Sequence, residues 1–571
     1  MISIDPDIAN SNRVSYGYLA TNEEHVIIDC GASDFYTDGN FLVWMGDEDL
    51  FQNSRSEVVQ SSNTVPHVMS TLRVFTSRKK NCYSISADKG GLLLVRASFF
   101  YGNYDKKSSP PSFDLHFDGN LWANVKTSLD QLVYYEVVYV AKSDTTSICL
   151  AQTEPNQFPF ISALEVRNLD SKMYNNFDPK YALFFRSRVA YGASATVRFP
   201  DDAYDRIWIP ATVGSGITSV ASDAIFIDVV NAPDNPPREV LQNAVAVSST
   251  SNSITLIPGF PDREVSVYIN LYFSEVTQLD ATQKRSFRAY TDDIPNSQLI
   301  VPPYGEVTEM FVNFTASSNT SFSLVATPDS KLPPLINAME VFFVSDLLTD
   351  GTNSTDVEGL GEFQKAFNVL EEYWSGDPCL PSPYTWEWIS CSNDTVPRVT
   401  ALNLSSFDLS GELPDFSFMD ALVTINLQNN SISGPIPDFL GDLPNLKELV
   451  SGNPDLCVSG KSCQPTTSTD GTIGSSTPSS RRKKSNKLPA ILGTTIPIFV
   501  IFWAIVGFLL HHKRKTAAIA AINAGPAGHA NRPSGANTMM GKVAEAVMDE
   551  IKVNIQEQTS TENDNQSNPQ Q

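Results

Sequence analysis

The sequence has little of what enzymes and metalloproteins usually display. Its 571 residues include only six histidines, and apart from His511-His512 these are scattered along the chain. No group of His, Cys, Asp or Glu residues has ligand spacing, so neither a metal centre nor a catalytic triad is predicted. The acid pairs Asp201-Asp202 and Asp292-Asp293 do not suit a glycosidase, because neighbouring residues on a strand point to opposite faces. We therefore expect no catalytic residue, metal or cofactor.

Positive charge is scarce outside one short segment. The net charge is −24, yet residues 481–515 hold eight Lys or Arg and no acid. The rest of the chain is therefore strongly acidic, which argues against a nucleic-acid partner. The basic residues flank Leu488 to Leu510, 23 residues without a charge, which is long enough to span a bilayer. The sequence predicts one transmembrane helix.

An apolar segment of the kind that starts secretion is absent from Met1 to Asn22. Counted alone, the basic residues before the span would place the N-terminal side in the cytosol. N-glycosylation sequons and the cysteine pairs described below favour the opposite, type I orientation. We expect a signal peptide that is missing from this sequence; a tail-anchored protein facing the cytosol is the alternative. The sequons are at Asn313, Asn319, Asn353, Asn393, Asn403 and Asn429.

Residues 24–346 have the pattern of β-strands. In residues 265–273 the apolar side chains alternate with more polar ones, as expected of a strand with one buried face. Turn signals such as Asp118-Gly119 and Pro302-Pro303 recur between such runs. An all-β sandwich architecture follows.

The same region repeats itself. Residues 159–166 resemble residues 334–341, and residues 93–101 resemble residues 266–274 at nearly the same separation. Two matches in the same order indicate two copies of one domain. We expect domain A at residues 24–170 and domain B at residues 185–346.

A second kind of repeat follows a polar join. Residues 399–414 align with residues 422–437, and Leu404 and Leu427 occupy equivalent places. Each copy has the form of a leucine-rich repeat, with Asn430 at the usual asparagine position of the second copy. We expect residues 347–398 to form the join and N-terminal cap, and residues 399–463 to form the repeats and C-terminal cap.

Cysteines flank these repeats in pairs. Cys379 and Cys391 precede them, and Cys457 and Cys463 follow them. Their placement predicts two disulfide-closed caps in an oxidising compartment. Cys30, Cys82 and Cys149 lie in the β region, and because three is odd, at least one is free or pairs outside the chain.

The C-terminal part has low complexity apart from the apolar span. Residues 464–487 are rich in Ser, Thr, Gly and Pro and predict a flexible stalk. The cytoplasmic tail, residues 511–571, is expected to be mostly disordered, with a short amphipathic helix near Met540–Ile555.

Several long motifs resemble those of plant malectin-like receptors with leucine-rich repeats. The matching segments are Ile28-Asp-Cys-Gly31, Tyr36-Thr-Asp38, residues 96–105, residues 198–208, residues 335–342 and Gly376-Asp-Pro-Cys379. The resemblance implies a mainly β fold with tandem malectin-like β-sandwiches, a short repeat array and a plasma-membrane location. It departs from receptor kinases because 61 residues follow Leu510 and contain no kinase motif. The sequence therefore looks like a receptor-like protein that acts through a receptor kinase.

Binding is the function that this resemblance implies. Malectin itself is a disaccharide-binding lectin, and Phe100, Tyr101, Asn103, Tyr104 and Asp105 combine aromatic faces with polar groups in the way that sugar binding needs. The alternative for the first two is the core of a strand. Cell-wall carbohydrate and a secreted peptide are both expected as ligand classes, with a receptor kinase as co-receptor. A structural adhesion protein of the cell wall, without signalling, is the other hypothesis.

Overall fold

The computed structural model describes residues 25–51, 53–60, 64–211, 216–450, 452–453 and 456–457. The predicted stalk, the predicted transmembrane segment Leu488–Leu510, the tail and Cys463 lie outside these ranges. Within them the chain is mainly β, as predicted. None of the helices in the described part is long and apolar enough to cross a bilayer.

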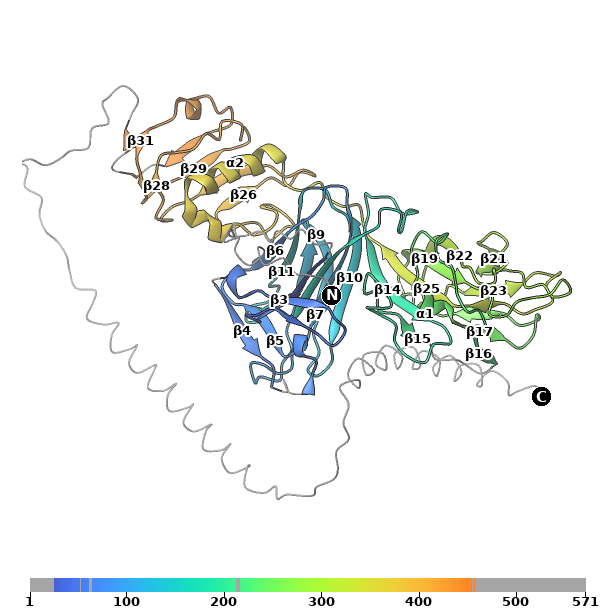
Figure 1. Ribbon diagram of the computed structural model, residues 1–571. Helices are drawn as coiled ribbons and strands as arrows, with labels where there is room; N and C mark the ends of the chain where they lie inside the picture. The colour runs from blue at the N-terminus through green and yellow to red at the C-terminus, as the bar shows by residue number, and fades with distance from the viewer. Residues whose placement is uncertain are drawn as a thin grey trace, which may run out of the picture. The chain divides into compact units, whose positions relative to one another are not determined.

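One large sheet passes through both predicted domains (Figure 1). Domain A (residues 25–169) and domain B (residues 183–344) meet where β10 pairs antiparallel with β14, through Val137↔Phe184 and Val138↔Leu183. The two sandwiches are therefore joined through backbone hydrogen bonds as well as through side chains. The strand order is β2 (Tyr36–Thr37), β3 (Val43–Gly46), β1 (His25–Asp29), β13 (Ala163–Leu169), β7 (Leu92–Phe99), β10 (Val133–Val140), β14 (Leu183–Ala190), β25 (Ala338–Val344), β19 (Val265–Phe273) and β22 (Thr308–Ala316), with β15 (Ile209–Pro210) beside β14.

Smaller sheets complete each sandwich. In domain A they are β6 (Lys80–Ser86), β11 (Thr145–Ala151), β8 (Ser112–Phe117) and β9 (Asn120–Lys126), and β12 (Phe160–Ile161), β5 (Thr71–Phe75) and β4 (Ser54–Val58). In domain B they are β16 (Ile217–Ala221), β17 (Asn243–Val247) and β24 (Leu335–Ile336), and β18 (Ile254–Leu256), β23 (Phe322–Ala326), β20 (Phe287–Thr291) and β21 (Ile294–Pro295). A short helix, α1 (Arg238–Leu241), precedes β17.

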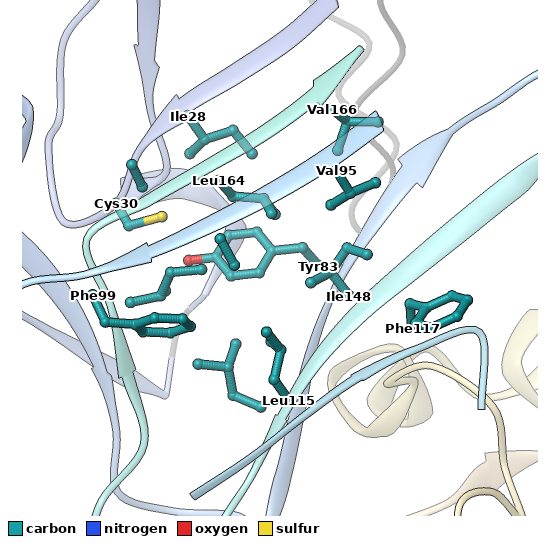
Figure 2. Close-up of a cluster of buried hydrophobic side chains, with 14 of the residues drawn as sticks. Ile28, Cys30, Tyr83, Val95, Phe99, Leu115, Phe117, Ile148, Leu164 and Val166 are labelled. Carbon is teal, nitrogen blue, oxygen red and sulfur yellow. The ribbon is translucent and has the colours of Figure 1, made fainter. Parts of the chain in front are cut away.

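The core of domain A lies between its sheets (Figure 2). Val95 and Leu164 from the shared sheet face Leu115 and Ile148 from β8 and β11, and all four are fully buried. Burying an aliphatic side chain of this size contributes about 1.5–3 kcal/mol. The alternation that predicted strands from sequence is therefore the alternation between this core and the outer faces.

The internal repeat in the sequence corresponds to a repeat in space. β13 and β25 contain the two matching segments, and each lies next to the strand that carries the other match, β7 and β19 respectively. The two domains therefore use equivalent strands at the centre of the same sheet.

A row of buried charged side chains crosses the seam between the domains. Glu165, Arg96 and Glu136 are cross-strand neighbours in domain A, and Arg188 and Glu340 are cross-strand neighbours in domain B. Arg188 Nη2 joins the two halves by donating to Glu136 Oε1 at 2.8 Å. Charges of opposite sign thus alternate along the row, which is what makes their burial tolerable.

The segment 198–208 covers this row. Its Asp205 accepts from Arg198 Nη2 at 2.6 Å and from Arg96 and Arg167 at 3.2 Å each. Burial raises the pKa of Asp205, but the three guanidinium groups outweigh it and hold the pKa well below its ordinary value. The motif therefore acts as a clasp over the seam.

The described C-terminal part contains α2 (Ser354–Ala366), the short 3-10 helix η5 (Asn368–Tyr373) and parallel strands. The main sheet consists of β26 (Ile389–Cys391), β27 (Val399–Asn403), β29 (Thr424–Asn426) and β32 (Glu448–Val450). β27 and β29 pair in parallel with Ala401 opposite Thr424, which is the spacing of the sequence repeat. The short pairs are β28 (Ser410–Gly411) with β30 (Ser431–Ile432), and β31 (Gly434–Pro435) with β33 (Leu456–Cys457).

Asn430 has the role that the repeat pattern predicts. Its amide oxygen accepts from the backbone N–H of Phe407 and Leu409, and its amide nitrogen donates to the carbonyls of Leu404 and Leu427. The side chain therefore replaces backbone partners inside the turn between strands.

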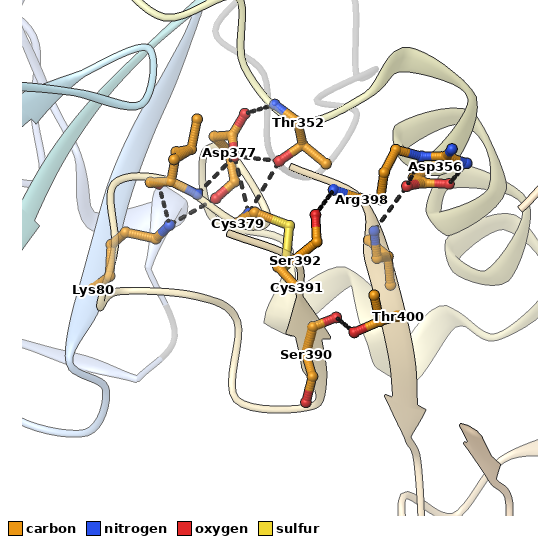
Figure 3. The surroundings of a disulfide bond; sticks show 12 residues. Lys80, Thr352, Asp356, Asp377, Cys379, Ser390, Cys391, Ser392, Arg398 and Thr400 are labelled. Atoms are coloured by element: carbon orange, nitrogen blue, oxygen red, sulfur yellow. Dashed lines mark hydrogen bonds and ion pairs between the residues drawn. A yellow bond between two sulfur atoms is a disulfide. The ribbon is translucent and has the colours of Figure 1, made fainter. Parts of the chain in front are cut away.

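The structure also assigns the cysteines that it describes. Cys379 is bonded to Cys391, the pair predicted for the N-terminal cap (Figure 3). Cys82 is bonded to Cys149 across β6 and β11, and Cys30 is a buried free thiol. The sequence left these three open, and the structure shows that Cys30 is the unpaired one.

Candidate functional site

The predicted ligand-binding loop lies at the end of β7, and its first two residues are buried. Phe100 and Tyr101 are 3% and 0% exposed, so neither presents a ring face to solvent. The Tyr101 hydroxyl donates to Asp105, and its ring contacts that of Tyr104 edge-on. The alternative considered for Phe100 and Tyr101, a place in the core, is where the structure puts them.

The other three residues of this loop are partly exposed but already have partners. Asn103 donates to Gln60 at 3.1 Å and accepts from the Ser108 N–H at 2.8 Å. Tyr104 packs on the Phe160 ring at 5.8 Å. Burial raises the pKa of Asp105, but the hydrogen bonds that it accepts from Tyr101 and Lys107 outweigh this and lower the pKa overall. That Tyr104, Asn103 and Asp105 bind a ligand stays a prediction.

A second surface, which the sequence did not single out, presents free aromatic rings. Residues 35–44 form a hairpin in which Tyr36 pairs with Trp44 and Thr37 pairs with Val43. Tyr36 and Trp44 point inward, so Phe35 and Val43 point outward, and Phe41 projects from the turn. Phe35 is 71% exposed and Phe41 is 75% exposed. Exposed phenylalanines on a rigid turn are uncommon unless something binds them.

The hairpin is held rigid by one carboxylate. Asp38 accepts hydrogen bonds from the backbone N–H groups of Asn40 and Leu42 and from the Trp44 indole at 3.1 Å. The turn that carries Phe41 is therefore fixed from inside, so little conformational entropy is lost when its ring is covered.

A buried carboxylate lies directly behind the hairpin. Asp29, the last residue of β1, is fully buried and accepts from the Tyr36 hydroxyl at 2.8 Å and from the Thr71 hydroxyl at 2.9 Å. Nδ1 of His67 lies 3.5 Å from the same carboxylate. Burial raises the pKa of Asp29 to about 6, although the hydrogen bonds from Tyr36 and Thr71 oppose the rise.

His67 connects this carboxylate to solvent. Its side chain is 68% exposed, and its ring lies 4.3 Å from that of Tyr36. We name Phe35, Tyr36, Phe41 and His67, with Asp29 beneath them, the hairpin site. It combines aromatic faces with a polar group that titrates near neutrality, an arrangement suited to a polyhydroxylated ligand.

A further buried layer fixes the hairpin site to the core of domain A. Asp47 accepts from Arg73 Nη2 at 2.6 Å, from the Tyr83 hydroxyl at 2.7 Å and from the Gly31 N–H at 2.6 Å. The strand ends that carry Asp29 and the hairpin are thereby tied to β5 and β6. The motifs Ile28–Gly31 and Tyr36–Asp38 contained the signal for this site, but the sequence showed only their resemblance to a family.

The acid pairs discounted from sequence are parts of turns. Asp202 is buried and accepts from Arg206 and from the Trp208 indole, whereas Asp201 is exposed. Asp292 accepts from the Ser321 N–H in a turn. Over the residues that the structure covers, no three His, Cys, Asp or Glu side chains lie close enough to share a metal ion.

The sequon asparagines lie at the surface. Asn353 is partly buried and caps α2 by accepting from the Thr355 N–H at 3.1 Å. The exposed ones are Asn313, Asn319, Asn393, Asn403 and Asn429. Their modification stays a prediction.

Comparison with known proteins identifies what this chain is similar to. The model of the malectin-like domain matches residues 28–344. An uncharacterised protein of Arabidopsis thaliana is 37% identical over 343 residues, which cover 59% of this chain and 68% of that protein. A probable LRR receptor-like serine/threonine-protein kinase of the same plant is 33% identical over 400 residues, which cover 68% of this chain and 46% of the kinase.

The similarity to solved structures concerns the fold. The ANX2 ectodomain from Arabidopsis thaliana superposes with a TM-score of 0.50 at 16% identity, over 57% of this chain and 97% of the ectodomain. The chain spans about half the length of the receptor kinases that it matches.

Proposed function

This chain belongs to the malectin-like domain family, and we propose that it is a cell-surface receptor-like protein whose extracellular region binds carbohydrate or peptide ligands. In this proposal Leu488–Leu510 is the membrane anchor, the N-terminal side lies outside the cell, and the parallel strands from β27 onward are leucine-rich repeats. A receptor kinase is the signalling partner.

The hairpin site is the observation that carries the proposal. The C–H bonds of a pyranose face are weakly positive and pack against the negative face of an aromatic ring. Phe35 and Phe41 offer such faces, and the Tyr36–His67–Asp29 group provides hydrogen bonds for hydroxyls beside them. Saccharides are therefore the ligand class that this surface favours over peptides.

Two substitutions test this directly. Phe35→Ala and Phe41→Ala should each lower the affinity for an oligosaccharide found by glycan-array screening by about 3- to 30-fold, the loss expected for one aromatic contact. Phe226→Ala is the matched control, because Phe226 is also an exposed phenylalanine but lies in domain B. Titration calorimetry on the purified protein measures the effect.

The opposite result is equally clear. If no oligosaccharide binds while a secreted peptide does, or if the control variant loses as much affinity as the two hairpin variants, the hairpin site is not the carbohydrate site. The three remaining loop residues, Asn103, Tyr104 and Asp105, would then be tested against the peptide.

Partnership with a receptor kinase rests on the relatives. The region shared with the receptor kinases lies outside their kinase domains in this proposal, so we expect association through the ectodomain, which offers far more than the about 1,000 Å² that a specific interface needs. Deleting 516–571 should weaken kinase co-purification without abolishing it, whereas deleting 374–463 should remove most of it. If the tail deletion alone removes every kinase, the tail is the docking region.

A further inference from the structure

The chain returns to domain A after it has completed domain B. Residues 348–384 lie against the outer face of the β6–β11–β8–β9 sheet, opposite its core side. Lys142 Nζ donates to the Thr349 carbonyl at 2.6 Å, and Lys80 Nζ donates to the carbonyls of Asp377 and Leu380 at 2.6 and 2.9 Å (Figure 3). We name residues 372–384 the latch segment, because the contacts below attach the cap to domain A through it.

Most of these contacts are polar and involve backbone atoms. Arg78 donates to the Glu372 carbonyl and lies over the Tyr373 ring at 4.5 Å. The Tyr384 hydroxyl donates to Asp114 at 3.0 Å. The hydrophobic cluster of domain A and that of the cap and repeats are separate. Separation at this surface would therefore leave both cores intact, as at the polar interfaces between domains that move.

At the centre of the contact, Gly376 lies on the Cys82–Cys149 disulfide. A Cβ atom at this residue would stand 2.6 Å from Cys82 Sγ and 2.7 Å from Cys149 Sγ, and its φ of +61° also disfavours any side chain. Ser375 accepts the Cys82 N–H at 3.0 Å through its hydroxyl. The two sulfurs are thus covered by backbone, and Cys149 is only 2% exposed.

We propose that the latch segment is redox-sensitive: it stays docked while Cys82 and Cys149 are bonded and is released when a dithiol reduces them. Reduction breaks the Sγ–Sγ bond, places one hydrogen on each sulfur and converts the dithiol to its disulfide. Two non-bonded sulfurs need more space than two bonded ones, and the space above them is occupied by Gly376.

The strands themselves hold without the disulfide. β6 and β11 pair through seven residue pairs from Ser86↔Thr145 to Lys80↔Ala151, and Tyr83 and Ile148 beside the cysteines point into the core. Reduction therefore changes the outer face of this sheet and not its pairing. Because thiol attack requires access to a sulfur, the docked latch segment also protects the bond, and docking and oxidation stabilise each other.

The first test uses the full-length protein in detergent and measures how fast dithiothreitol reduces each disulfide, by differential alkylation and mass spectrometry. Gly376→Ala should speed reduction of Cys82–Cys149 at least tenfold, because the new Cβ pushes the latch segment off the sulfurs. Gly90→Ala is the matched control: its φ is also positive, at +83°, but no atom lies within 4 Å of its Cβ. Equal rates in wild type and Gly376→Ala overturn the proposal.

The second test needs no substitution at the latch segment. Hydrogen exchange of the wild type after reduction should rise in residues 372–384 and at the Cys82 amide, and stay unchanged in the core strand β7. Increased exchange in β7 means that the sandwich has unfolded, and unchanged exchange in 372–384 means that the latch segment has stayed docked. Either result overturns the proposal.

A double variant separates the two disulfides. Cys82→Ala with Cys149→Ala has no sulfur to push against Gly376, so its latch segment should stay docked in dithiothreitol. If it is released there as well, reduction of Cys379–Cys391 within the cap is responsible, and the proposal is wrong.

Discussion

Replacing Asp205 with asparagine should strongly destabilise the junction between the two malectin-like domains. The carboxylate is fully buried and accepts hydrogen bonds from Arg96, Arg167 and Arg198 as well as from the Phe199 N–H. Asparagine has nearly the same shape, so no cavity forms. What changes is the charge, because three guanidinium groups lose one shared counter-ion.

The expected size follows from that loss. Removing one partner of a buried ion pair costs about 3–5 kcal/mol, because the remaining charge is neither solvated nor paired. Glu165 still accepts from Arg96 and Arg167, so Arg198 is the group left with the poorest compensation. For a region of this size the change corresponds to a fall of about 5–15 °C in the unfolding midpoint.

Thermal and urea unfolding of the purified protein, followed by tryptophan fluorescence, would measure this. Trp208 is buried in the same clasp, so its emission reports on the seam. Asp201→Asn is the matched control, because Asp201 belongs to the same motif but is exposed, and it should change stability by less than about 0.5 kcal/mol. An Asp205→Asn protein within about 1 kcal/mol of the wild type would refute the reasoning.

Two further predictions concern other buried polar groups. Burial raises the pKa of Asp234 to about 7 and that of Glu309 to about 8. Since the folded protein keeps protons that the unfolded chain has lost, this contribution to stability is complete below about pH 4 and is lost as the pH rises towards 8. Glu309→Gln should therefore flatten the unfolding midpoint measured between pH 4.5 and 8.5, and curves that stay parallel to the wild type would contradict it. Asn430→Ala should lower stability by about 3 kcal/mol, because it leaves buried backbone groups without partners, whereas exposed Asn429→Ala should cost less than about 1 kcal/mol; urea midpoints that fall equally would show that the turn does not depend on Asn430.

The sequence predicted the class of fold because the fold depends on repeating patterns. Alternation in residues 265–273 depends on one face being buried, and the same physics places that segment in β19. The 23-residue spacing around Asn430 requires equivalent turns, and the structure has them. Both signals are local, so a single sequence carries them.

What the sequence did not predict depends on contacts between distant residues. Arg96, Glu136 and Arg188 lie in apolar runs, and only the register of β7, β10 and β14 shows that they neutralise one another. Phe100 and Tyr101 had the composition of a ligand site, but composition does not tell which end of a strand turns inward. The exposure of Phe35 and Phe41 likewise depends on the pairing of residues 36–44.

The shared sheet has a consequence for solubility. Two separate sandwiches would each present two unpaired edges from such a sheet, and unpaired edges are where β proteins add strands from other molecules and aggregate. Pairing β10 with β14 removes one edge from each domain and leaves the ends at the short β2 and at β22. β22 is the longer of the two, and Asn313 lies exposed within it, in a sequon. A glycan at Asn313 would keep the remaining long edge of the sheet from pairing with another chain.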